Sequence, residues 1–185
     1  MTAPDLMSTH PDRSLLRERQ RVVIAGTVGR GRRPTSYYAG VGNRFWELVH
    51  QSGLVGERLG PDQAGRLADL GVGLTDLVLE RVEHPRREPE VVVHRAPFDA
   101  AVRGTAPQVV AFVSKTAATW YARGAGVRLP QGYGELDWSV AGVPAFVLPG
   151  PSGANNGMPL ALRLAMWTDL TDFLAHLESR ERPGG

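Results

Sequence analysis

The sequence predicts a three-layer α/β/α fold around a central, mostly parallel four-stranded sheet. Apolar runs of strand length alternate with helical patterns along the chain, as in α/β proteins. Two of these runs, 21–26 and 107–113, are almost continuously apolar, as expected for parallel strands that are covered on both faces. With 185 residues and 42% hydrophobic residues, the chain suits one such domain and leaves little room for a second.

The individual elements follow from local patterns. Short apolar runs predict strands at 21–26, 72–79, 107–113, 138–140 and 145–148. Spacing at i, i+3 and i+4 and capping signals predict helices at 42–52, 61–70, 114–121 and 159–178. The charged, proline-containing stretch 80–89 is expected to be an exposed loop, whereas 91–103 fits either a strand or a helix. Residues 127–135 and 149–157 are expected to be loops.

One domain is expected over residues 21–178, flanked by a mobile, polar N-terminal arm at 1–20 and a frayed tail at 179–185. No apolar run reaches membrane-spanning length, and the first 21 residues are too polar for a secretory signal. We therefore expect a cytoplasmic monomer that does not contact a membrane. The absence of cysteine excludes disulfides, thiolate metal sites and a cysteine nucleophile, and the histidines lack metal-ligand spacing, so no metal and no cofactor are expected.

The charge is unevenly distributed although the net charge is only +2. Lys115 is the only lysine among 21 basic residues, and arginines cluster between Arg13 and Arg33, where Glu18 is the only acid. Local basic patches matter more than net charge for binding phosphate backbones. Codon usage in a GC-rich genome explains the arginine-to-lysine ratio equally well, but it does not explain the clustering.

The segment from Val22 to Tyr38 is the first candidate site. Its apolar run ends at Gly26 and gives way to a glycine- and arginine-rich stretch, and ligands of open α/β sheets bind beyond the carboxyl ends of strands. Guanidinium groups can bind phosphates in bidentate geometry, and glycines let backbone N–H groups approach an anion. Tyr37 and Tyr38 offer flat faces for base stacking. The pattern predicts a site for a nucleotide within a nucleic acid.

Three motifs in fixed order strengthen this prediction. They are Tyr38-Ala39 followed by Asn43-Arg44-Phe45-Trp46, then residues 73–78, and finally residues 147–153. This ordered set resembles the uracil-DNA glycosylase superfamily over about residues 21–178. The nearest branch is similar to the mismatch-specific uracil/thymine-DNA glycosylases, while the Tyr-Tyr-Ala spacing and the Ala154-Asn155 pair are similar to the hypoxanthine-DNA glycosylases.

The resemblance implies roles for particular residues. Residues 26–31 would form a first catalytic loop facing the sugar and the flipped base, with Gly26, Thr27 and Gly29 in the site. Tyr38 would stack on the base, Asn43 would act in catalysis, and Ser114 and Lys115 would border the base pocket. Residues 149–156 would enter the minor groove. The DNA-contacting residues would be Arg30, Arg32, Arg33, Ser152, Gly153, Asn155 and Asn156.

Each role has a plainer alternative. Asn43 precedes a helix and could serve only as its cap, Tyr38 could only cover the rim of the core, and Lys115 could be merely solvated. The same holds for the arginine run, and Asn155 and Asn156 also suit an ordinary turn.

The sequence departs from the family pattern at two positions. Relatives place Asn or Asp in the first loop, where it positions the attacking water, but residues 27–30 contain neither. Gly150 stands before Pro151, where relatives carry His or Asn. Both departures favour the hypoxanthine branch, a weak glycosylase or changed chemistry. Asp76, after the second strand, and Glu47 are the remaining carboxylates that could act on water.

Together these observations predict a monofunctional DNA glycosylase that flips a deaminated base out of DNA and hydrolyses its N-glycosidic bond in base excision repair. Uracil from G:U pairs is the first expected substrate and hypoxanthine the second. The alternative is a lesion-binding protein of the same fold that no longer cuts. The absence of Asn or Asp from the first loop favours this alternative. A hydrolase of free nucleosides is a third hypothesis, which the basic loops disfavour.

Overall fold

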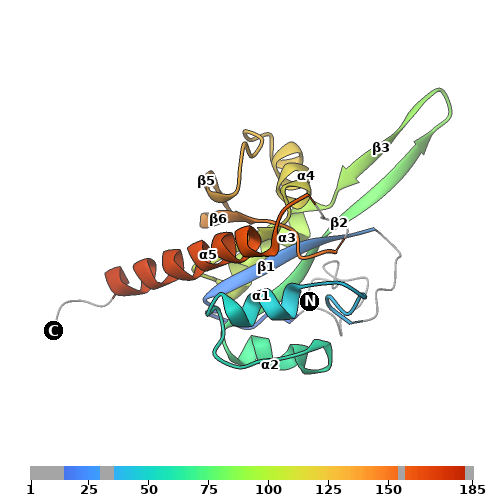
Figure 1. Cartoon of the computed structure of the whole chain (residues 1–185). Coiled ribbons are helices and arrows are strands. Elements are labelled where there is room, and N and C mark those ends of the chain that lie inside the picture. Colours follow the sequence, from blue (N-terminus) through green and yellow to red (C-terminus); the bar gives the residue numbers. More distant parts are fainter. Residues whose placement is uncertain (1–14, 30–35, 154–156, 182–185) are drawn as a thin grey trace.

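The computed structural model describes residues 15–29, 36–153 and 157–181. A six-stranded sheet in the order β3-β2-β1-β4-β6-β5 lies between two layers of helices (Figure 1). The strands are β1 (Val22–Gly29), β2 (Val72–His84), β3 (Arg87–Val93), β4 (Val109–Val113), β5 (Gly134–Val140) and β6 (Val143–Leu148). The helices are α1 (Phe45–Gln51), the short 3₁₀ turn η1 (Pro61–Gln63), α2 (Ala64–Asp69), α3 (Arg95–Thr105), α4 (Lys115–Ala125) and α5 (Leu160–Glu181).

The prediction of a four-stranded sheet is wrong in strand number. The inner strands β2, β1, β4 and β6 pair in parallel, whereas β3 and β5 are antiparallel edge strands. The missed edge strand β3 alternates exposed and half-buried residues and carries charges, so its composition resembles that of a loop. Pro89 is compatible with β3 because an edge strand leaves one side of its backbone unpaired.

The expectation of a loop at 80–89 is therefore also wrong. These residues complete β2, form a turn and begin β3. The resulting hairpin projects beyond the sheet (Figure 1). The ambiguous stretch 91–103 divides into the end of β3 at Val93 and the start of α3 at Arg95.

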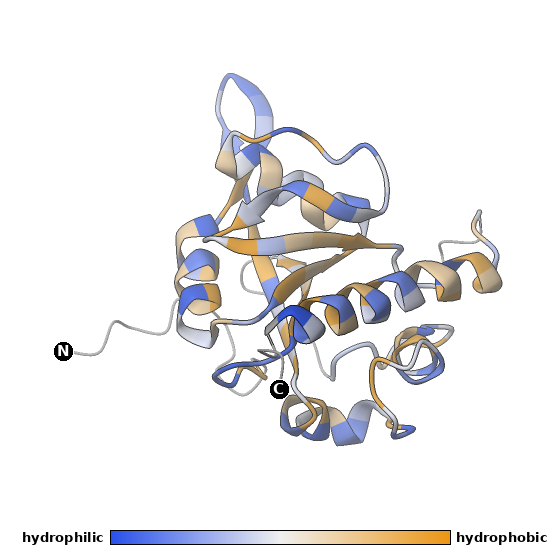
Figure 2. Ribbon diagram, turned by 90° about the vertical axis from the view of Figure 1, so that its left-hand side faces the viewer, coloured by the Kyte–Doolittle hydropathy of each residue, from blue (hydrophilic) through white to orange (hydrophobic). Residues whose placement is uncertain are grey.

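Two apolar clusters hold the three layers together. One lies between the sheet and helices α1, α2 and α5 and includes Phe45, Leu67 and Trp167. The other lies between the sheet and helices α3 and α4 and includes Phe98 and Tyr121. The apolar strands in the centre and the mixed surfaces of the outer helices are visible in Figure 2. The first five residues of β1 and all of β4 are buried because they face both clusters.

Residues outside both limits of the predicted domain take part in the described structure. The Leu15 N–H donates to the Leu74 carbonyl (3.0 Å), and the Arg19 N–H donates to the Thr105 carbonyl (2.7 Å). At the other end, α5 continues to Glu181. Residues 15–20 therefore lie against the sheet and the end of α3.

The carboxyl ends of the parallel strands define one edge of the domain. β1 ends at Gly29, β4 at Val113 and β6 at Leu148, and parallel strands end on the same side. β1 does not stop at Gly26 as predicted: residues 26–29 remain paired with residues 76–79 of β2. Gly26, Thr27 and Gly29 are thus strand residues, held more firmly than loop residues would be.

Candidate active site

Gly26 marks the point where two polar side chains, those of Asp76 and Tyr38, converge. It pairs in register with Asp76 of β2. A Cβ atom added to Gly26 would lie 2.7 Å from Asp76 Oδ1 and 3.3 Å from Tyr38 Oη. Real Cβ atoms do not approach other atoms as closely as 2.7 Å, so the carboxylate occupies the space that any other side chain would need. A carboxylate and a phenol therefore meet over the backbone of β1.

Tyr37 and Tyr38 serve different parts of the molecule. Tyr37 is buried, and its hydroxyl donates to the Leu74 carbonyl (3.3 Å). Tyr38 is half-buried, has a left-handed backbone (φ 53°), and stacks on Phe45 with ring centroids 3.9 Å apart and an interplanar angle of 15°. Phe45 thus fixes the plane of the Tyr38 ring beside Gly26. This packing fits both interpretations of Tyr38, as a base-stacking residue and as a cover for the core.

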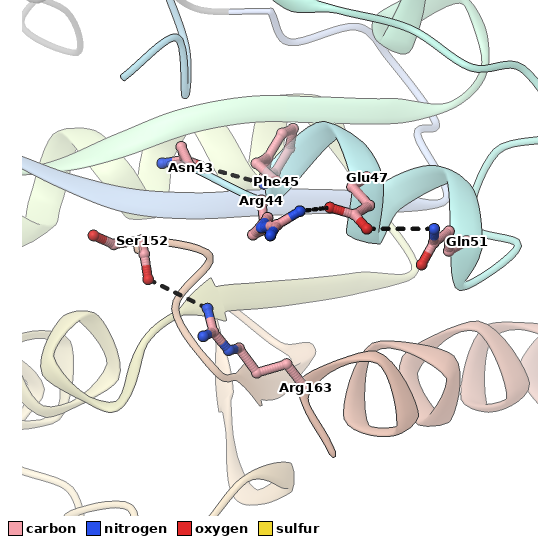
Figure 3. A network of polar contacts seen from close by, with 7 residues as sticks. All are labelled: Asn43, Arg44, Phe45, Glu47, Gln51, Ser152 and Arg163. Atoms are coloured by element: carbon pink, nitrogen blue, oxygen red, sulfur yellow. Dashed lines mark hydrogen bonds and ion pairs between the residues drawn. The ribbon is translucent and has the colours of Figure 1, made fainter. Parts of the chain in front are cut away.

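Asn43 holds the start of α1 with one half of its carboxamide. Its Oδ1 accepts a hydrogen bond from the N–H of Phe45, the first residue of α1, at 2.9 Å, so the side chain binds a backbone donor at the helix start (Figure 3). The other half, the Nδ2 amide, points away from the helix in Figure 3 and makes no hydrogen bond within the described part of the chain. Because the Phe45 N–H must face an acceptor, the orientation of the amide is determined. Capping therefore leaves a fixed N–H donor available.

The late Pro-Ser-Gly segment, residues 151–153, lies directly against the start of α1. A Cβ atom on Gly153 would lie 2.9 Å from the Gly42 carbonyl oxygen, so the two backbones touch. The Arg44 N–H also donates to the Pro151 carbonyl (2.8 Å). The structure therefore brings Ser152 and Gly153 next to Asn43, although more than a hundred residues separate them in the chain.

Two side chains of α5 hold this segment from inside, and sequence analysis missed both. Arg163 is only 6% exposed. Its Nε donates to the Met158 carbonyl (3.1 Å), and its guanidinium donates to the Ser152 carbonyl (3.3 Å; Figure 3). The Trp167 indole donates to the Pro149 carbonyl (3.2 Å). An arginine four residues before a tryptophan on an otherwise apolar helix face was the available signal.

Ser114 caps α4, because its Oγ accepts a hydrogen bond from the Ala117 N–H at 3.1 Å. Its backbone is unusual, with φ 125° and ψ 152°, a region that non-glycine residues occupy at a cost of order 1–3 kcal/mol. A Cβ on Gly150 would lie 3.7 Å from the Ser114 Cβ, so Ser114 borders the late segment. Lys115 is turned elsewhere: its Nζ lies 5.1 Å from the centre of the Tyr133 ring and 3.4 Å from the Gln131 carbonyl.

Five predicted DNA contacts lie outside the described residues. They are Arg30, Arg32, Arg33, Asn155 and Asn156. Of the predicted residues within β1, Thr27 is exposed and Gly29 is half-buried.

A hollow of about 580 Å³ opens beside α1 and shares Asn43 with the site. Arg44 and Arg58 line it, and both are exposed. Arg44 pairs with Glu47 (2.6 Å; Figure 3). Two other residues of its wall contribute buried nitrogens, Trp46 Nε1 and His50 Nδ1, that have no hydrogen-bond partner among the residues that the structure describes. The hollow therefore extends a polar surface from Asn43 along the outer side of α1.

Within the described ranges of the chain, the one strongly shifted pKa belongs to a residue on the opposite face of the sheet. Burial, followed by hydrogen bonding to Asp99 (2.8 Å), raises the pKa of Tyr121 to about 12. This contact ties α4 to α3 and is structural. Among the described residues, no cluster of three or more histidine, aspartate or glutamate side chains could hold a metal ion, and no helix is both long and apolar enough to cross a bilayer.

The fold and the site define a class: a three-layer α/β domain whose polar site lies at the carboxyl edge of the parallel strands, where proteins of this architecture bind their ligands. Its sequence matches the model of the Uracil DNA glycosylase superfamily over residues 14–171, and the chain belongs to this family. The superfamily that the motifs resembled is thereby confirmed. Its members are in general DNA glycosylases, hydrolases that act on DNA in repair, and membership indicates this activity for the chain.

Proposed function

We propose that the protein is a monofunctional DNA glycosylase that extrudes a deaminated base and hydrolyses its N-glycosidic bond. Uracil opposite guanine is the first substrate, and hypoxanthine is the second. The observation that supports this most is the convergence of Gly26, Tyr38, Asn43 and the 151–153 segment at one edge of a sheet that belongs to a glycosylase family.

Tyr38 and Asn43 supply the groups that a flipped base needs. Extrusion costs a few kcal/mol, least for a mispaired base, and stacking on an aromatic ring repays part of it. Tyr38 offers a ring already fixed by Phe45. The Nδ2 amide of Asn43 can donate to a base oxygen, on which negative charge accumulates as the bond breaks. A donor that is oriented before the reaction stabilises such charge without reorganisation.

The DNA strand follows the polar surface around this point. The 151–153 segment, held by Arg163 and by the Arg44 N–H, enters the minor groove behind the extruded nucleotide. Arg58, on the rim of the hollow that begins at Asn43, contacts a neighbouring phosphate, as do Arg30, Arg32 and Arg33. The protein acts on duplex DNA as a monomer.

Labelled duplexes with uracil, hypoxanthine, xanthine or thymine opposite guanine, cleaved with alkali after incubation, test the proposal. Asn43→Ala and Tyr38→Ala are expected to lower single-turnover excision by about 10²-fold or more, since each removes a preorganised contact. Asp69→Asn, on the exposed end of α2, is the matched control and should excise at the wild-type rate. Absence of excision from every duplex contradicts the proposal, and borohydride trapping of a covalent adduct contradicts the monofunctional mechanism.

A lesion-binding protein without activity is the second candidate. Residues 26–29 contain no carboxylate or amide side chain, and this absence favours it. The two functions differ in one measurement: the lesion binder retains salt-dependent, lesion-selective affinity while product stays at background during prolonged incubation with excess enzyme.

A further inference from the structure

Hydrolysis of the glycosidic bond needs a group that orients water and accepts its proton, and β1 provides none. The sequence offers two other carboxylates near the site, Asp76 and Glu47. Glu47 bonds to Arg44 at 2.6 Å and to Gln51 at 3.4 Å, and it lines the hollow on the outer side of α1. We infer that Asp76 is the catalytic carboxylate that binds and deprotonates the attacking water, an inference that rests on the proposed glycosylase function.

The sheet places Asp76 on the face where the base would lie. Side chains two residues apart on a strand share a face. Leu74, two residues before Asp76, and Ile24, two residues before Gly26, both belong to the cluster beneath α1. Asp76 therefore projects from that same face, toward the start of α1 that carries Asn43. Its neighbours Thr75 and Leu77 are buried, but Asp76 itself is half-buried, as a group that must reach water requires.

The close approach of Asp76 to Gly26 defines where the carboxylate lies. Asp76 Oδ1 lies 2.7 Å from the point where a Cβ of Gly26 would be, so the carboxylate leans across β1 rather than along β2. Tyr38 Oη lies 3.3 Å from that same point. A base stacked on Tyr38 would therefore place its sugar near the carboxylate. The carboxylate comes from the second strand and reaches the patch of backbone that the first strand leaves bare.

The reaction step balances with water as the only co-reactant. The water oxygen forms a bond to C1′ as the bond from C1′ to the base nitrogen breaks, and the bonding electron pair leaves with the base. Asp76 takes the proton of the attacking water and later releases it to solvent. Asn43 stabilises the departing base, which acquires its proton from solvent. The products are the free base and an abasic site with a C1′ hydroxyl.

Asp76→Asn tests the inference because it keeps the shape of the side chain and removes the acceptor of the proton. Loss of a general base is expected to lower the single-turnover rate by about 10²- to 10⁴-fold. Affinity for duplex DNA that carries the uncleavable 2′-fluoro analogue of deoxyuridine should stay within about threefold of wild type. Asp69→Asn is again the matched control. Asp76→Ala adds a second readout, because added formate should restore part of its rate.

Three outcomes overturn the inference. Excision by Asp76→Asn within about threefold of wild type, with the wild type active, removes Asp76 from the reaction and leaves the proposed function standing. Equal loss of binding and excision assigns Asp76 to DNA binding. Absence of excision by the wild type on every duplex refutes the proposed function and this inference together. Circular dichroism and thermal unfolding identify a variant that fails to fold, and formate rescue of Asp76→Ala then decides the question.

Discussion

Replacing Gly26 with alanine adds one methyl group at the point where Asp76 and Tyr38 converge. The new Cβ would lie 2.7 Å from Asp76 Oδ1 and 3.3 Å from Tyr38 Oη. The backbone tolerates the change, because Gly26 is not among the glycines with positive φ. The terminal torsion of an aspartate is broad, so the carboxylate rotates or shifts while β1 stays in place.

The stability change is expected to be small because two effects oppose each other. Overpacking costs about 1–3 kcal/mol, and the low end applies where the displaced atom ends a side chain. Replacing glycine by alanine at a compatible backbone geometry returns about 0.4–1 kcal/mol through the unfolded state. The unfolding free energy of Gly26→Ala should therefore lie within about 1 kcal/mol of wild type. Excision should fall by about 10²-fold, since a displacement of about 1 Å in a catalytic geometry has that effect.

Denaturant unfolding and single-turnover excision, measured on the same preparations, test whether Gly26→Ala loses activity while it keeps its stability. Gly65→Ala is the matched control, because no atom lies within 4 Å of its added Cβ; it should be at least as stable as wild type and fully active. Retention of wild-type excision by Gly26→Ala would refute the argument that the position of the Asp76 carboxylate matters. A decrease of more than about 3 kcal/mol in the unfolding free energy of Gly26→Ala would show that the backbone, rather than the Asp76 side chain, had to move.

Three further substitutions probe the support of the site and the packing on the opposite face of the sheet. Arg163→Met removes the donor to the half-buried Met158 and exposed Ser152 residues' carbonyls and should lower the unfolding free energy by about 1 kcal/mol. DNA binding should also weaken, and unaltered binding would mean that the late segment does not need this support. Ser114→Gly relieves the strained backbone, while replacing the serine cap by glycine costs only a few tenths of a kcal/mol. The temperature of thermal unfolding should therefore rise by the equivalent of about 1 kcal/mol. A lower unfolding temperature would argue against strain. Folding raises the pKa of Tyr121 to about 12, so the stabilisation from its protonated hydroxyl is fully present below about pH 10 and is lost as the pH rises toward 12. The expected loss of unfolding free energy is roughly 2–3 kcal/mol. Tyr121→Phe should lack this loss in alkaline unfolding, and identical pH profiles for the variant and the wild type would contradict the assignment.

The inner strands were predictable because each is buried on both faces and reads as a continuous apolar run. The edge strand β3 was not predictable, although part of the other edge strand, β5, was. The first four residues of β3 are three charged residues and a proline, and its exposed residues alternate with half-buried ones, so its composition does not distinguish it from a loop. The end of β1 was missed for a related reason: β4 pairs with β1 only as far as Ala25, and beyond that β1 is supported by β2 alone. Residues 27–29 are consequently exposed or half-buried.

The site could be predicted only where its parts adjoin in the sequence. Tyr38 and Asn43 stand close together and belong to one motif, so their region was identified. The contact of Gly42 with Gly153 depends on how the late segment returns to the sheet, and the role of Arg163 depends on which face of α5 turns inward. Neither is encoded in local spacing. The glycines at 42 and 153 gave a weak signal, since close backbone approach requires residues without side chains.

The register of β1 against β2 has the largest consequence for function. In the family pattern the group that orients water comes from the first strand's own loop, and its absence here suggests an inactive protein when the sequence is considered alone. In the folded sheet, however, residue 76 lies beside residue 26, and a shift of one residue would turn Asp76 toward the opposite face of the sheet. A carboxylate on the neighbouring strand can therefore occupy the space left free by a glycine and act at the same place as a residue of the first loop. The position of a catalytic group relative to the substrate, rather than its position in the chain, determines whether the chemistry can proceed.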